Sequence, residues 1–178
     1  MMFIAHLLST TTITQLPTRQ ILLALLFCFA PVLATAAEVA KSDPAPNVLG
    51  FDHVGLVVLD LEASKKFFTD VLGFETVGKD ADYPAYFLNN GHAFVTLWRA
   101  NDPASANRFD RKANVGLHHM ALRVSSDAAL TALYEAARVF PGVKIEFAPE
   151  LSYGGPAKHM MIYEPSGNRI ELIFRPPN

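Results

Sequence analysis

One strand-like segment occurs twice in this chain, and each copy carries a histidine at the same position. The first copy reads FDHVGLVVL at residues 51–59, and the second reads GLHHMALRV at residues 116–124. A helical pattern and then three strand-like segments follow each copy. A unit of roughly 50 to 60 residues that occurs twice in tandem is expected to build one core from both copies.

The turn and cap residues of each unit place its elements. In DLEASKKFFTDVLGF, Asp60 is typical of a helix N-cap and Gly73 of a helix stop. In SSDAALTALYEAARVF, either Ser126 or Asp127 is expected to cap the second helix. The predicted strands are FETVGKD, YPAYFLNNG and HAFVTLWRA in the first unit, and VKIEFAPE, KHMMIYE and RIELIFRP in the second.

This order predicts an α+β fold of two tandem strand–helix–three-strand modules. Module one covers residues 50–100, a polar linker covers 101–115, and module two covers 116–176. Neither module buries both faces of its own sheet, so we expect the two to pair. The expected product is a cup-shaped, curved sheet around a shared cavity, with the helices outside.

The N-terminal region predicts export. Residues 1–37 contain one charge, Arg19, then the apolar run ILLALLFCFAPVL and small residues suited to signal peptidase. The alternative is a membrane anchor, but the run is shorter than the roughly 20 residues that span a bilayer. We therefore expect a cleaved signal peptide, a flexible tether at residues 38–49, and a periplasmic or secreted protein without stable membrane insertion.

The composition of the mature chain excludes several partners. Its only cysteine, Cys28, would leave with the signal peptide, so neither a disulfide nor thiolate chemistry is expected. The net charge of −2 becomes −3 when Arg19 is removed. So mild a balance gives no reason to expect nucleic acid or an anionic membrane surface as partner.

Superposing the two units pairs their chemically active residues. His53 falls on His119, and Thr96 falls opposite Glu171. Alternation along a strand places His119 on the cup side, whereas His118 should point away from the cup toward the helix layer.

The segments DHVGLVVLDLEASKKFFTDVLGFE and YEPSGNRIELIF resemble the vicinal oxygen chelate superfamily of glyoxalases, bleomycin-resistance proteins and extradiol dioxygenases. The resemblance covers residues 50–176. It implies two βαβββ modules that form a cup and hold a divalent metal at its base. It implies nothing specific about the reaction.

Carried over by position, the resemblance implies metal ligands at His53, His119 and Glu171, with Thr96 at the fourth family position. A hydroxyl is a poor ligand, so three protein donors would leave positions open for water, substrate or dioxygen. Fe(II) or Mn(II) is favoured as the one divalent metal, and Zn(II) or Ni(II) is possible. Without a metal, the histidines would be core residues and Arg123 or Arg169 would compensate the charge of Glu171.

Further residues are candidates for catalysis and substrate binding. Extradiol dioxygenases carry a tyrosine where this chain has Met161, and His159 and Tyr163 share its face as candidate acids or hydrogen-bond donors. The loop YGGPAKH is a candidate lid or a plain hairpin. The expected substrate wall, which ordinary sheet packing would also explain, consists of Tyr86, Thr96, Trp98 and Arg123.

These features favour an exported, divalent-metal-dependent glyoxalase/dioxygenase-type enzyme, either a dioxygenase or a lyase or isomerase. Its small substrate would chelate the metal through two oxygens. One alternative is a non-catalytic, bleomycin-resistance-like protein that binds a drug or metabolite, and another is a thiol-transferring resistance enzyme. The cup is completed either within one chain or across a homodimer, and the sequence leaves both arrangements open.

Overall fold

The structure, a computed structural model, describes residues 48–177. The predicted signal peptide and nearly all of the predicted tether lie outside the described residues. No helix in the described part of the chain is long and apolar enough to cross a membrane.

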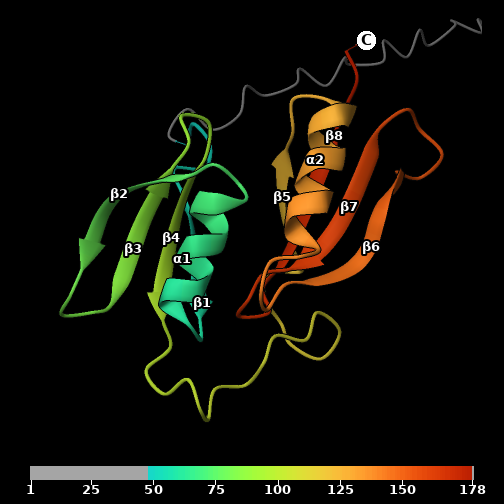
Figure 1. Cartoon of the computed structure of the whole chain (residues 1–178). Coiled ribbons are helices and arrows are strands. Elements are labelled where there is room, and N and C mark those ends of the chain that lie inside the picture. Colours follow the sequence, from blue (N-terminus) through green and yellow to red (C-terminus); the bar gives the residue numbers. More distant parts are fainter. Residues whose placement is uncertain (1–47, 178) are drawn as a thin grey trace, which may run out of the picture. The chain divides into compact units, whose positions relative to one another are not determined.

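The first module is a four-stranded sheet with one helix (Figure 1). Its strands lie in the order β1-β4-β3-β2, with β1 parallel to β4 and the other neighbours antiparallel. Its elements are β1 (Val54–Val58), α1 (Leu61–Asp70), β2 (Glu75–Asp80), β3 (Ala85–Asn89) and β4 (Phe94–Arg99).

The second module repeats this topology with the strand order β5-β8-β7-β6. Its elements are β5 (Met120–Arg123), α2 (Asp127–Ala137), β6 (Lys144–Leu151), β7 (Lys158–Tyr163) and β8 (Arg169–Phe174). The predicted duplication of strand, helix and three strands is therefore confirmed.

The caps and stops act as the sequence indicates. The carboxylate of Asp60 accepts a hydrogen bond of 2.9 Å from the backbone N–H of Ala63, which satisfies a free donor in the first turn of α1. Ser126 makes the corresponding bond in α2, so it is the N-cap and Asp127 is the first helical residue. Gly73 adopts a φ of 71°, a left-handed conformation that suits glycine after a helix.

The register of the sheets confirms the superposition of the two units. Thr96 pairs with Gly55, two residues after His53, and Glu171 pairs with Ala121, two residues after His119. The predicted ligand positions of the first module are therefore equivalent to those of the second.

The pairing of the modules differs from the expected single curved sheet, because the chain forms two separate four-stranded sheets. Each sheet turns one face toward a helix and the common core and leaves the other face open. The expected placement of the helices outside needs correction for α1, since Phe67 of α1 is fully buried and its ring lies 5.5 Å from that of Phe140 in the second module. The core includes Leu56, Val58, Phe68, Leu88, Val95, Leu97, Leu130, Met160, Ile162, Ile170 and Leu172.

A buried polar cluster joins the two modules at the turn between β7 and β8. Glu164 is 1% exposed, and its carboxylate accepts hydrogen bonds from the Ser64 hydroxyl at 2.6 Å and from the backbone and side chain of Asn168. Ser166 accepts from the backbone N–H groups of Leu59 and Asp60. These bonds satisfy a buried carboxylate that would otherwise be costly, and they tie α1 to the second module.

Candidate metal and substrate site

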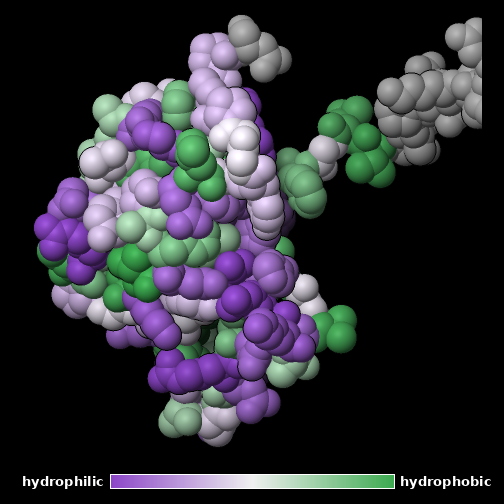
Figure 2. Space-filling view, turned by 90° about the vertical axis from the view of Figure 1, so that its right-hand side faces the viewer, coloured by the Kyte–Doolittle hydropathy of each residue, from purple (hydrophilic) through white to green (hydrophobic). Residues whose placement is uncertain are grey.

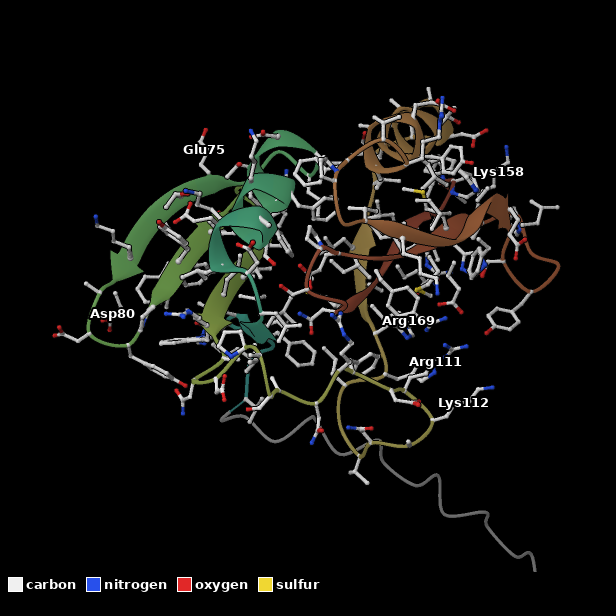
Figure 3. The ribbon with its side chains drawn as sticks, turned by 60° about the horizontal axis from the view of Figure 1, so that its bottom comes forward. Glu75, Asp80, Arg111, Lys112, Lys158 and Arg169 are labelled. Carbon is white, nitrogen blue, oxygen red and sulfur yellow. The ribbon has the colours of Figure 1, made fainter. Side chains whose placement is uncertain are left out.

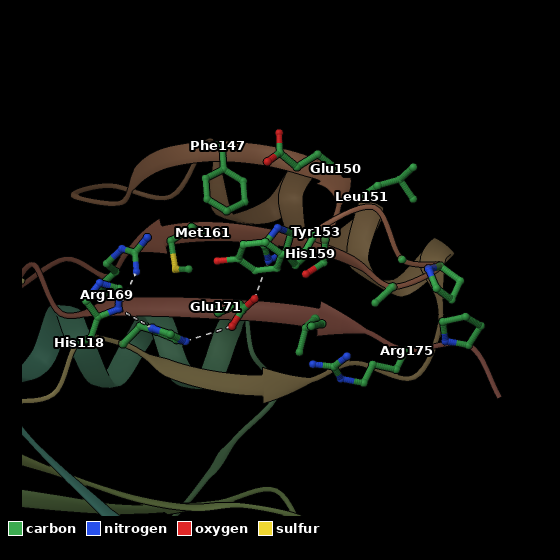
Figure 4. A pocket seen from close by; sticks show the side chains of 17 residues that line it. His118, Phe147, Glu150, Leu151, Tyr153, His159, Met161, Arg169, Glu171 and Arg175 are labelled. Atoms are coloured by element: carbon green, nitrogen blue, oxygen red, sulfur yellow. Dashed lines mark hydrogen bonds and ion pairs between the residues drawn. The ribbon is translucent and has the colours of Figure 1, made fainter. Parts of the chain in front are cut away.

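The largest cavity lies on the open face of the second sheet (Figure 4). It has a volume of about 680 Å³, and side chains from β6, β7 and β8 form its floor. Residues two apart on a strand share a face, so alternate residues of β7 and β8 contribute side chains to this floor. The lining includes His119, Phe147, Tyr153, His159, Met161, Arg169, Glu171, Ile173 and Arg175.

Glu171 lies between two imidazoles in this cavity. Its Oε2 is 3.1 Å from Nε2 of His119, and its Oε1 is 2.5 Å from Nδ1 of His159. The side chains of Glu171 and His159 are 13% and 10% exposed, so the contacts are largely shielded from water. The expectation that Arg123 or Arg169 compensates Glu171 is wrong, because two histidines occupy that position.

The other cation candidates lie elsewhere. Arg123 is exposed on β5 and does not line this cavity. Arg169 is 8% exposed and makes a two-pronged ion pair with Glu146, at 2.7 Å from Nε and 3.1 Å from Nη2. Arg169 therefore closes one end of the cavity without neutralising Glu171.

The segment between β4 and β5 reaches this ion pair (Figure 3). Nη2 of Arg111 lies 3.2 Å from Oε1 of Glu146, and Nη1 of Arg111 donates to the Tyr163 hydroxyl at 3.0 Å. Tyr163, a predicted catalytic residue, is therefore held by Arg111 and does not line the largest cavity. The hydrogen bond from Arg169 holds the pKa of Glu146 below its ordinary value, and the same bond raises the pKa of Arg169.

This ion pair should make stability depend on pH in the acid range. The pKa of Glu146 is lower in the folded chain, so its contribution is full above the ordinary glutamate pKa and disappears as pH falls through the folded value. Glu146→Gln is expected to lower the free energy of unfolding by about 1–3 kcal/mol at pH 7. Denaturant unfolding at pH 7 and pH 3 measures this, and a deficit that stays constant between the two would contradict the assignment.

His118 does not point toward the helix layer, as strand alternation had predicted. Strand β5 begins only at Met120, so alternation does not apply to residues 118–119, and His118 lines the same cavity as His119. Its Nδ1 is 2.9 Å from Nδ1 of His119 and 3.4 Å from Nη1 of Arg169. Desolvation and the positive charge of Arg169 lower the pKa of His118, which favours the neutral imidazole.

His53 lies apart from the Glu171 contacts. It immediately precedes β1, its side chain is 47% exposed, and its ring packs against Phe94 at 5.6 Å. It lines a second cavity of about 390 Å³, which His119 also borders but Glu171 does not. Among residues 48–177, no three His, Cys, Asp or Glu side chains converge closely enough to hold a metal ion.

One chain therefore brings together two of the three predicted metal donors, His119 and Glu171. An imidazole nitrogen and a carboxylate oxygen placed side by side are ligands that suit Mn, Fe, Ni or Zn. His119 and Glu171 fit such an ion, and His53 would have to join them from another place.

The open face of the first sheet carries an aromatic cluster. The ring of Trp98 lies 5.0 Å from Tyr83 and 5.8 Å from Phe87, and its Nε1 donates to the Thr96 hydroxyl at 2.8 Å. Thr96 and Trp98 thus share the open face, as predicted. The hydroxyl of Thr96 therefore already accepts a hydrogen bond from Trp98. Gly55 leaves room for these two side chains, because a Cβ at position 55 would lie 3.2 Å from the Thr96 hydroxyl oxygen.

Contrary to the prediction, Tyr86 does not belong to the substrate wall. Its hydroxyl donates to Glu62 of α1 at 2.5 Å, so it lies on the helix face of the sheet and not on the open face. The register shows the cause, because Phe87 pairs with Thr96 as Met161 pairs with Glu171. Phe87 is therefore the residue of β3 that corresponds to Met161, and Tyr86, one residue earlier on the strand, points to the opposite face.

The loop YGGPAKH connects β6 and β7 at the rim of the largest cavity. The backbone N–H of Ser152 donates to the carbonyl of Ala157 at 2.9 Å, which closes a hairpin. Tyr153 is fully exposed and adopts a φ of 48°, which is unusual for a residue with a side chain. The surface on this side of the molecule mixes hydrophobic with hydrophilic groups (Figure 2).

Two modules of one topology, with a histidine–carboxylate pair on the open face of the second sheet, define a class of α+β proteins built by duplication. Residues 50–172 match the Glyoxalase/Bleomycin resistance protein/Dioxygenase superfamily. The chain belongs to this superfamily, as its sequence motifs predicted.

Two characterised relatives show how varied the chemistry of similar proteins is. A catechol-2,3-dioxygenase of Bacillus subtilis (strain 168) is 36% identical over 73 residues, which cover 36% of this chain and 26% of the relative. A 2-epi-5-epi-valiolone epimerase of Actinomyces sp is 29% identical over 153 residues, which cover 74% of this chain and 82% of the relative.

Solved structures share the fold. A glyoxylase/bleomycin resistance protein/dioxygenase domain from Frankia sp. EAN1pec matches with a TM-score of 0.62 at 20% identity, over 72% of this chain and 99% of that one. The fosfomycin resistance protein FosX from Listeria monocytogenes matches with a TM-score of 0.56 at 15% identity, over 74% and 94% of the two chains.

Proposed function

We propose that this chain is an exported, divalent-metal-dependent enzyme of the glyoxalase/dioxygenase type. Its substrate is a small molecule that chelates the metal through two oxygens. The observation that carries the proposal is the pair formed by Nε2 of His119 and Oε2 of Glu171, 3.1 Å apart on the floor of a cavity. The dioxygenase and epimerase named among the relatives support a catalytic function.

The chain's own residues would bind and orient the substrate. His119 and Glu171 would hold the cation, and a bound divalent cation would supply a Lewis acid that polarises the substrate oxygens. Phe147 and Met161 line the same cavity and would exclude water from the reacting atoms. Arg175, exposed at the end of β8, gives the cavity a cationic end that suits an oxygen-bearing or anionic group.

We further propose that His53 of a second copy completes the ligand set, so that the working form is a homodimer. His53 is half-exposed at the start of β1, an edge strand of its sheet. Apolar side chains near it also face solvent, among them Phe51 at 97% exposure and Val57 at 62%. Exposed apolar groups of this kind mark interaction surfaces, and a second copy presenting His119 and Glu171 would cover them.

One alternative has a specific observation in its favour. A bleomycin-resistance-like protein binds its ligand without turnover and needs no complete metal site. Within residues 48–177, no group of three His, Cys, Asp or Glu side chains could hold a metal ion. Tight stoichiometric binding of a small ligand by protein whose His119 and Glu171 carry no metal would favour this alternative.

The decisive test of the proposed function is elemental analysis of the protein after anaerobic loading with Fe(II), Mn(II) or Zn(II). We expect about one ion per chain in the wild type, and strong loss of bound metal in His119→Ala because an imidazole ligand is removed. Equal, near-zero metal content in both preparations would refute the proposed function.

A further inference from the structure

His159 is a buried imidazole outside the three-donor set, and its position gives it a distinct task. It lies on β7, in the interior of the second sheet, and is 7% exposed. It pairs across the sheet with Ile173 of β8, while its neighbour on the same face, Met161, pairs with Glu171. His159 and Glu171 are therefore diagonal neighbours on one face, within reach of each other's side chains.

The carboxylate of Glu171 is divided between two histidines. Nδ1 of His159 lies 2.5 Å from Oε1, and Nε2 of His119 lies 3.1 Å from Oε2 (Figure 4). A carboxylate oxygen only accepts hydrogen bonds, so Nδ1 of His159 must be the donor. That contact leaves Oε2 as the oxygen on the side of His119.

The imidazole of His159 has little freedom to turn away. The ring of Phe147 lies 5.0 Å from it, and the ring of Tyr153 lies 6.3 Å from it at the cavity rim. Such packing fixes the ring plane, and the low exposure strengthens a hydrogen bond to a charged acceptor. The contact is therefore a fixed feature of the cavity floor.

We infer that His159 is a positioning residue for Glu171. It holds Oε1 through its Nδ1–H, so that Oε2 alone is presented beside His119 as a metal donor. This inference rests on the proposed function, because it concerns the same metal site. It replaces the role predicted from the sequence, in which His159 acts on the substrate as an acid or hydrogen-bond donor.

Two substitutions of matched size separate positioning from packing. Asparagine places an amide nitrogen where His159 has Nδ1, so His159→Asn keeps a donor for Glu171. Leucine has the same number of side-chain heavy atoms as asparagine but no hydrogen-bond donor for Glu171. If His159 only fills space, the two variants should behave alike.

The experiment titrates Co(II) into metal-free wild type, His159→Asn and His159→Leu, and records the affinity and the visible absorption bands of the bound ion. Loss of a residue that orients a ligand typically costs 10–100-fold in metal affinity, so we expect about that loss in His159→Leu. Its absorption bands should shift, since Glu171 can reorient. We expect His159→Asn to stay close to wild type in both measurements.

The outcomes are distinguishable. Unchanged affinity and bands in His159→Leu, or equal losses in both variants, would overturn the positioning role while the proposed function stands. If the wild type binds no Co(II) at all, the proposed function itself fails and the inference falls with it. A measurement that needs no variant is the ¹⁵N NMR spectrum of the wild-type histidines, where a proton on Nδ1 of His159 is expected and an unprotonated Nδ1 would overturn the inference.

Discussion

Replacing Glu171 by glutamine is expected to abolish metal binding and turnover together. The substitution keeps the size of the side chain but removes the negative charge, and it replaces a carboxylate ligand with a neutral amide. The loss should exceed the 10–100-fold that removal of an outer-shell partner typically costs. Titration of Mn(II) and turnover of a metal-chelating substrate would measure it.

The chain offers a matched control for this substitution. Glu150 lines the same cavity on β6 and is exposed, with no ion pair to the described residues. Glu150→Gln removes the same charge from the same cavity and should leave metal affinity nearly unchanged. Equal losses in the two variants would indicate a general electrostatic effect and would contradict the role of Glu171 as a ligand.

Two inactive variants should restore activity when they are combined. If His53 of one copy joins His119 and Glu171 of another, a heterodimer of His53→Ala and His119→Ala contains one intact site and one site that lacks both histidines. Random reassortment of an equal mixture gives about one half heterodimers, so about a quarter of the wild-type metal sites and activity should return.

Each variant alone supplies the baseline for this mixture. Both homodimers lack one histidine at every site, so each should be close to inactive before the subunits are exchanged by co-refolding. Failure of the mixture to exceed its two components, in a preparation shown by mass spectrometry to contain heterodimers, would refute the shared site.

The sequence was sufficient to predict the repeating unit, because the signals that define it are local. Asp60 and Ser126 cap their helices by accepting a hydrogen bond from the backbone N–H three residues later, and Gly73 adopts a left-handed conformation just after α1. The equivalence of Thr96 and Glu171 also followed from the repeat, since both lie in the last strand of a module and pair with the first.

The sequence was less reliable about which way single side chains point. Tyr86 was expected in the substrate wall, but its neighbour Phe87 pairs with Thr96, and consecutive residues of a strand point to opposite faces. His118 was assigned by alternation, but the strand begins after it. Both errors arise at positions where the exact start or pairing of a strand decides the orientation.

The contacts that matter most for the site depend on pairing between strands. The diagonal contact of His159 with Glu171 follows from the register of β7 against β8, and Arg111 reaches Glu146 from the segment between the modules. Neither contact leaves a signal in a local sequence pattern. The arrangement of the modules likewise depends on a few long-range contacts, such as Ser64 with Glu164.

Crystals of the Mn(II)-loaded protein, measured at a wavelength where manganese scatters anomalously, would test the central claim most directly. The account predicts an anomalous peak bonded to His119 and Glu171 of one copy and to His53 of a second copy. A peak bound by other residues, or well-loaded crystals with no peak at His119 and Glu171, would contradict it.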